Sequence, residues 1–137
     1  MAPPEPPLVL ETTTGSETLD DVQRLLDELW STHDVSDVVR MHVDLAVGEI
    51  AANIVEHSGA GRPVHLRMAA EWLPDAVRVT FHDDGHVTPT EVGSFELPDA
   101  MSERGRGLAI AHRVLDELAY RRDGNGNHWT LIRHRDG

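Results

Sequence analysis

In the first half of the chain, apolar residues recur at intervals of three and four, which is the spacing of helices with one buried face. The pattern predicts a helix over residues 18–32 and a longer helix capped by Ser36. Thr18 and Asp21 have the spacing of a capping box, which favours a helix start at this point. We expect two buried stripes, formed by Leu19, Val22, Leu25, Leu26 and Leu29 and by Val39, Val43, Val47, Ile50 and Ile54.

Beyond the turn-forming residues 58–63, the apolar period changes to two, which predicts strands. The residues around Pro74 have the composition of a hairpin turn, and so do residues 123–126. The predicted strands, including one near the N-terminus, are residues 8–12, 64–68, 77–81, 117–122 and 128–134. A further helix is expected from about Gly107 to Leu115.

Residues 85–104 follow neither period and contain Pro89, Gly93 and Pro98. A segment of this length is too long for an ordinary connection in a compact domain. We therefore expect a functional lid between the third predicted strand and the last predicted helix.

The order of the elements is strand, two helices, two strands, lid, helix and two strands. This order favours the α+β class, with helices layered on one face of a mixed sheet. A chain of 137 residues suits one domain. Residues 1–7 contain four prolines, so we expect them to form a disordered tail and residues 8–137 to form the domain.

Composition narrows the classes of function. The 12 Lys and Arg residues face 24 Asp and Glu residues, a formal charge of −12, so direct binding to a nucleic acid backbone is disfavoured. The chain has no cysteine, which excludes disulfides and thiolate chemistry. No leader pattern is visible, and no apolar run approaches the roughly 20 residues of a membrane span. We expect a cytoplasmic protein that binds neither membrane nor nucleic acid.

Three polar residues lie four apart on the second predicted helix: Glu49, Asn53 and His57. Four residues advance an α-helix by little more than one turn, so the three side chains follow one face. Asn53 can give its side-chain oxygen to Mg²⁺, and Glu49 can accept a proton from a hydroxyl group or a water. A solvated helix face has the same composition, so both interpretations stay open at this point.

A second candidate segment is Asp83, Asp84 and Gly85, directly before the expected lid. An ionised carboxylate only accepts hydrogen bonds and therefore suits an exocyclic amine such as that of adenine. The glycine beside it lets the backbone approach a flat ring. The same dipeptide is common in turns, which is the alternative interpretation.

The third segment, Arg104, Gly105, Arg106 and Gly107, directly precedes Leu108. Two glycines at a helix start leave the first N–H groups unobstructed, and with the helix dipole these groups bind phosphate. The arginines add positive charge. A glycine-bearing loop into a helix is the alternative, and the preceding irregular stretch disfavours a dinucleotide-binding fingerprint.

Thr130 lies between Trp129 and Leu131 in the last predicted strand. Alternation places Thr130 on the opposite face from these two residues. Its hydroxyl group is a candidate for reinforcing adenine binding, and the alternative is that it serves only as a strand former.

The order and spacing of these segments resemble the GHKL ATPases, the histidine-kinase-like ATPase superfamily with the Bergerat fold. Residues 49–53 with His57 look like the N box, residues 83–85 like the first glycine box and residues 105–107 like the second. The spacing of Glu49, Asn53 and His57 is similar to that of the anti-sigma-factor serine/threonine-protein kinases. The resemblance covers roughly residues 8–134.

The resemblance implies a two-layer α/β sandwich with a mixed, mostly antiparallel sheet and three main helices on one face. It also implies ATP and Mg²⁺ as cofactors. Asn53 would hold Mg²⁺, Asp83 would bind adenine, Gly105 and Gly107 would face the phosphates, and Glu49 would be the general base. The other residues expected in nucleotide binding are His57, Gly85, Arg104, Arg106, Leu108 and Thr130.

The activity implied is that of an ATP-dependent protein serine/threonine kinase and anti-sigma factor. Its implied partners are an anti-sigma-factor antagonist with an accepting serine, a sigma factor that it sequesters, and a second copy of the chain. The alternative is a non-catalytic nucleotide-binding regulatory protein. Val87 stands where the family pattern has a second glycine, and Arg104 stands where it often has a serine. A two-component histidine kinase is disfavoured, because no helical hairpin with a phosphorylatable histidine precedes these segments.

Overall fold

The structure is a computed structural model that describes residues 5–87 and 103–135, with the backbone alone for residues 103–106. The elements in chain order are β1 (Leu8–Thr13), α1 (Thr18–Ser31), α2 (Asp37–Asn53), the π-helical turn η1 (Ile54–Ser58), β2 (His65–Trp72), β3 (Ala76–Asp83), α3 (Glu103–Val114), β4 (Glu117–Asp123) and β5 (Gly126–His134). The predicted order of strands and helices is confirmed.

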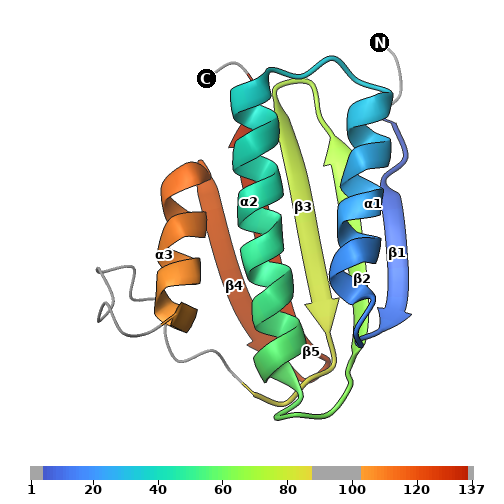
Figure 1. Ribbon diagram of the computed structural model, residues 1–137, viewed down its shortest axis with the longest axis vertical. Helices are drawn as coiled ribbons and strands as arrows, with labels where there is room; N and C mark the ends of the chain where they lie inside the picture. The colour runs from blue at the N-terminus through green and yellow to red at the C-terminus, as the bar shows by residue number, and fades with distance from the viewer. Residues whose placement is uncertain (1–4, 88–102, 136–137) are drawn as a thin grey trace.

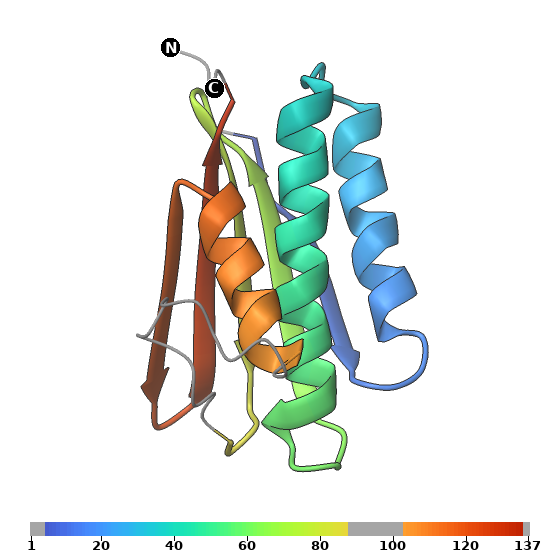
Figure 2. The same ribbon diagram turned by 60° about the vertical axis from the view of Figure 1, so that its left-hand side comes forward.

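The five strands form one sheet in the order β1-β2-β3-β5-β4, and all three helices cover the same face of it (Figures 1 and 2). The two-layer architecture is therefore confirmed. The sheet was expected to be mixed but mostly antiparallel, and every pair among the described strands is antiparallel. Short turns join β2 to β3 and β4 to β5, and such turns connect only antiparallel strands.

The hydrophobic core lies between the sheet and the helices, with α2 at its centre. The predicted α2 stripe is at most 2% exposed at each position. It packs against Phe81, Trp129 and other alternating residues of β2, β3 and β5. Four of the five predicted α1 positions are also buried, but Leu19 is 45% exposed, because Thr18 takes the inward position in the first turn.

The two predicted helix starts have different outcomes. Ser36 caps α2 as expected, and its hydroxyl oxygen accepts the Val39 N–H at 3.2 Å. The capping box at Thr18 is wrong, because Thr18 is the first residue of α1 and not its cap. The Thr18 hydroxyl oxygen accepts the N–H of Gly15 at 2.8 Å instead, which closes the loop before the helix.

Both segments predicted to lack regular structure lie mainly outside the described residues. The tail is described from Glu5, whose carboxylate lies 2.7 Å from Nε2 of His33. The lid is described only up to Val87. Helix α3 begins at Glu103, four residues before the predicted start. In the part of the chain that the structure describes, no helix has the length and apolarity needed to cross a bilayer.

Candidate functional site

Four segments far apart in the sequence meet at one end of the molecule. Helix α2 ends there, α3 begins there, β3 ends there and the β4–β5 turn lies there (Figures 1 and 2). Asp83 pairs with Asn127 across β3 and β5, and Gly107 of α3 lies against the side chain of Glu49 on α2. The three predicted segments are therefore brought to a common region.

Asp83 is completely buried at the end of β3. Its Oδ1 accepts hydrogen bonds from the Ser58 hydroxyl group, from the Gly85 N–H at 2.8 Å and from the Asn127 amide at 3.2 Å. Its Oδ2 is also buried, but it has no hydrogen-bond partner among the described residues. Native proteins rarely leave a buried polar atom unpaired, so this oxygen is a candidate acceptor for a ligand donor.

Gly85 lies where the end of β3 meets η1. A Cβ atom added at this position would collide with the backbone and side chain of Ser58 and would lie 2.8 Å from Oδ1 of Asp83. The absence of a side chain therefore allows the two segments to approach each other. The Gly85 carbonyl oxygen accepts a hydrogen bond from the Arg122 guanidinium group at 2.9 Å.

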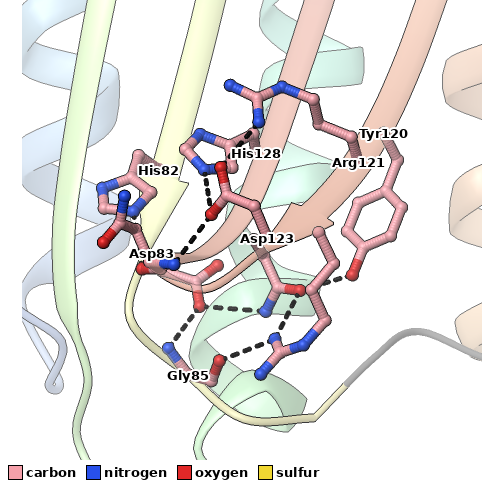
Figure 3. Close-up of polar contacts among 10 residues, drawn as sticks. His82, Asp83, Gly85, Tyr120, Arg121, Asp123 and His128 are labelled. Carbon is pink, nitrogen blue, oxygen red and sulfur yellow. Dashed lines mark hydrogen bonds and ion pairs between the residues drawn. The ribbon is translucent and has the colours of Figure 1, made fainter.

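Asn127, at the start of β5, belongs to the site but was not predicted. It is 1% exposed, and its side chain links Asp83 to β4 through Tyr120 and Arg122 (Figure 3). The sequence did contain a signal for it. Asn127 continues the alternating buried row of Trp129 and Leu131, where a polar residue is unexpected.

Thr130 is not brought to Asp83. It pairs with Thr80 of β3 and lies in the row that alternates with the buried residues of β5, on the sheet face without helices. Asp83 and Asn127 lie in the opposite, helix-facing rows. The expectation that Thr130 reinforces binding at Asp83 is therefore wrong, because alternation directs its hydroxyl group to the other face.

Glu49 and Asn53 lie four residues apart near the end of α2, so their side chains are neighbours along the helix. Asn53 is 7% exposed, and Glu49 is half-buried. Within the described residues, no hydrogen bond engages either side chain.

His57 lies in the π-helical turn η1 and not in α2. A π-helical turn contains more residues than an α-helical turn, so the spacing that aligned His57 with Glu49 and Asn53 ends at Asn53. The His57 side chain is about one third exposed, and its Nε2 lies 3.6 Å from the Glu56 carboxylate.

Gly107 makes the contact between α3 and α2 at the site. A Cβ atom at this position would lie 2.5 Å from Oε2 of Glu49, closer than real side chains approach. Because α3 begins at Glu103, Gly105 and Gly107 lie inside its first turns, whereas the helix was expected to start at about Gly107. Leu108 is 3% exposed and packs in the core. The side chains of Arg104 and Arg106 lie outside the described residues.

A charged cluster holds the β4–β5 turn on the other face of the sheet (Figure 3). The pKa of Asp123 is lowered, first because its carboxylate accepts the backbone N–H of Asn125 at 2.8 Å and then through His128 and Arg121. The His128 ring stacks on His82 of β3, with ring centroids 4.5 Å apart. These contacts keep the start of β5 beside the end of β3.

The site thus combines a buried carboxylate, a polar helix end and a helix start in one region. Residues 13–133 match the family model of the histidine kinase-like ATPase domain. The chain belongs to this family, and the resemblance seen in the sequence is confirmed. No curated protein matches the chain.

Solved structures share the fold. The RsbU and RsbW domains of Rv1364c from Mycobacterium tuberculosis match with a TM-score of 0.66 and 21% identity, over 96% of this chain and 33% of that chain. The histidine kinase domain of the blue-light activated histidine kinase from Erythrobacter litoralis EL346 matches with a TM-score of 0.62 and 17% identity, over 86% and 61%. This chain therefore spans about one third of the first structure and three fifths of the second.

A third solved structure is the nucleotide-free catalytic domain of the histidine kinase ThkA. It matches with a TM-score of 0.57 and 15% identity, over 93% of this chain and 97% of that chain. This match extends over nearly the whole of both chains. At such low identity, it establishes the fold.

Proposed function

We propose that this chain is an ATP-dependent protein serine/threonine kinase that phosphorylates an anti-sigma-factor antagonist and sequesters a sigma factor. The observation that carries the proposal is the Asp83 carboxylate, whose Oδ2 is buried and has no partner in the described residues. The site lies at the same end of the fold as Glu49 and Asn53 (Figure 1). The similarity to the mycobacterial RsbU and RsbW domains supports the anti-sigma part of the proposal.

The hydrogen-bonding pattern of the Asp83 carboxylate fits an adenine base. Oδ1 already accepts three hydrogen bonds, whereas Oδ2 accepts none from the described residues. A carboxylate oxygen can accept a hydrogen bond but cannot donate one. The exocyclic amine of adenine would supply the missing donor. A base with a carbonyl oxygen at that position would bring two acceptors together, and the site would reject it.

The end of α2 fits Mg²⁺ and a hydroxyl substrate. The Asn53 carboxamide oxygen is a suitable ligand for Mg²⁺, which when bound neutralises charge on the transferred phosphoryl group. Glu49 would accept the proton of the substrate serine hydroxyl group. The close packing of Gly107 against Glu49 fixes one side of this carboxylate.

The start of α3 fits the phosphates. Its first N–H groups have no partner within the helix and carry the positive end of the helix dipole. We assign phosphate contacts to this turn, including Gly105 and the arginines at positions 104 and 106. His57 is assigned to the same nucleotide site.

A phosphotransfer assay tests the proposal directly. The chain, Mg²⁺ and ATP are incubated with the antagonist encoded in the same genome, and phosphoserine is measured by mass spectrometry. Glu49→Gln should lower the transfer rate by about 10²- to 10⁴-fold while ATP binding stays unchanged. Glu56→Gln, on the exposed side of η1, is the matched control and should keep the wild-type rate. Equal rates for Glu49→Gln and wild type would remove the proposed base.

The rival function is a switch that binds nucleotide and partners without catalysis. Val87, in place of a glycine, favours it. This function would be supported if ATP binds saturably but the antagonist is not phosphorylated after incubation with Mg²⁺ and ATP. The proposal also includes a homodimer, which light scattering at several concentrations would test, and a cytoplasmic location.

A further inference from the structure

The Asn127 side chain occupies the centre of the hydrogen-bond network behind Asp83. Its Nδ2, which carries two hydrogens, lies within hydrogen-bond distance of three acceptors: Oδ1 of Asp83 at 3.2 Å, the hydroxyl oxygen of Ser58 at 3.1 Å and the carbonyl oxygen of Val87 at 3.3 Å. Three segments therefore share one amide group: the end of β3, the turn η1 and the start of the segment that follows β3.

The orientation of this amide is fixed from the other side. Its Oδ1 accepts the hydroxyl group of Tyr120 and an N–H of Arg122 at 3.0 Å. A guanidinium group can only donate, so the atom facing Arg122 must be the oxygen, and the NH₂ group must face Asp83. The same Arg122 nitrogen donates to the Gly85 carbonyl oxygen at 2.9 Å, which ties the network to the backbone beside Asp83 (Figure 3).

Position 127 consequently needs an acceptor on one side and a donor on the other. A carboxylate there would face Oδ1 of Asp83 with a second negative charge, in a place that is 1% exposed. A smaller or apolar residue would leave the Arg122 guanidinium and the Ser58 hydroxyl group without this partner. Asparagine satisfies both sides.

The same network explains how a valine can stand at position 87, where the family pattern has a glycine. The Val87 N–H donates to the Ser58 carbonyl oxygen at 3.1 Å, and the Val87 carbonyl oxygen accepts from Asn127. Among the described residues, Ala60 is the one non-glycine residue with a positive φ, so the Val87 backbone does not require glycine. The backbone is held by hydrogen bonds on both sides where the family pattern has a second glycine.

We propose that Asn127, held by Arg122 and Tyr120, is a positioning residue that sets the selectivity of the site for 6-amino purines. The Asn127 amide occupies Oδ1 of Asp83 and so leaves Oδ2 as the one acceptor for the base. The same amide anchors the backbone of Val87 beside Asp83. This inference rests on the proposed nucleotide-binding function.

The test compares Asn127→Asp with Asn125→Asp, which makes the same chemical change in the exposed β4–β5 turn. Dissociation constants are measured for ATP and for ITP, whose base has a 6-oxo group. Wild type and Asn125→Asp should both prefer ATP. Asn127→Asp should bind ATP roughly 10- to 100-fold more weakly, and its preference over ITP should shrink by a similar factor. A preference equal to that of wild type in folded Asn127→Asp would overturn the inference.

A pH series separates positioning from a general structural defect. The carboxyl group introduced at position 127 can donate once it is protonated, so the loss of ATP affinity relative to wild type should lessen between about pH 8 and pH 6. A loss that is independent of pH would count against the inference. If wild type binds neither nucleotide, the proposed function itself fails, which is a different outcome from loss of discrimination.

A second pair of variants serves if Asn127→Asp does not fold. Arg122→Gln removes the cation behind the amide, and Arg121→Gln changes the neighbouring residue, which pairs with Asp123 on the other face. Both arginines are exposed, so both proteins should fold. Selectivity for ATP over ITP should fall in Arg122→Gln and stay unchanged in Arg121→Gln, and equal selectivity in the two would overturn the inference.

Discussion

The base end and the phosphate end of the candidate site are built in different ways. At the base end, Asp83 and Asn127 are almost fully buried, and hydrogen bonds from four segments fix them. At the phosphate end, no hydrogen bond among the described residues holds Glu49 or Asn53, and the defined contact is with Gly107. Within the described residues, hydrogen bonds therefore fix the base end, whereas they do not fix Glu49 and Asn53 at the phosphate end. Changes at the first should act on binding, and changes at the second on transfer.

The largest effect on ATP binding is expected at the base end. Asp83→Asn keeps an acceptor for Ser58, Gly85 and Asn127 but turns an NH₂ group toward the position of Oδ2. We expect ATP affinity to fall about 100-fold, because two donors would then face each other. Calorimetric titration measures this affinity, and circular dichroism verifies that the fold is kept. Unchanged affinity would show that the base lies elsewhere.

A smaller effect, on the rate of transfer, is expected from the substitution of Gly107 at the phosphate end. Gly107→Ala would place a methyl group against Oε2 of Glu49, so this carboxylate must move. We expect phosphotransfer to slow about tenfold while ATP affinity changes little, since misplacing a catalytic group mainly affects rate. Single-turnover kinetics would separate the two effects.

Gly48→Ala is the matched control for Gly107→Ala. Gly48 lies in α2 with open space around an added Cβ atom. This substitution should leave the rate unchanged and stabilise the fold by about 0.5–1 kcal/mol, because alanine favours a helix over glycine. If both variants slowed transfer equally, the contact between Gly107 and Glu49 would have no special role.

The smallest effect is expected at Asp123, on the other face of the sheet. Its pKa is lowered in the folded state, so its contribution to stability is present above the unfolded pKa of about 4 and is lost as the pH falls below it. Asp123→Asn should lower Tm slightly at pH 7, and the difference from wild type should disappear in acid. Because the group is exposed, a large change would contradict this assignment.

The comparison also shows what sequence patterns can predict. The buried stripe of α2 and the strands were predicted from the spacing of apolar residues, because burial of one face imposes a regular spacing. At the base end, Asp83 and Gly85 were predicted but Asn127 was not, since Asn127 acquires its role from pairing with a residue 44 positions away. Thr130 was assigned to the site because its type suited the chemistry, although its own alternation directs it to the other face.

The local errors have physical causes as well. The spacing of Ile50 and Ile54 fits an α-helix and gives no sign that a π-helical turn starts at Ile54 and redirects His57. Gly105 and Gly107 were expected at the very start of a helix beginning near Gly107, where free N–H groups could bind phosphate. The structure places both inside α3, where the lack of a side chain at position 107 allows contact with α2.

The central claim is that one end of this fold binds ATP through Asp83. Titration of wild-type protein with Mg²⁺ and ATP in a calorimeter tests it most directly. The account predicts one saturable site per chain, with ATP preferred over ITP. The absence of measurable binding at millimolar ATP, or equal affinity for the two nucleotides, would contradict it.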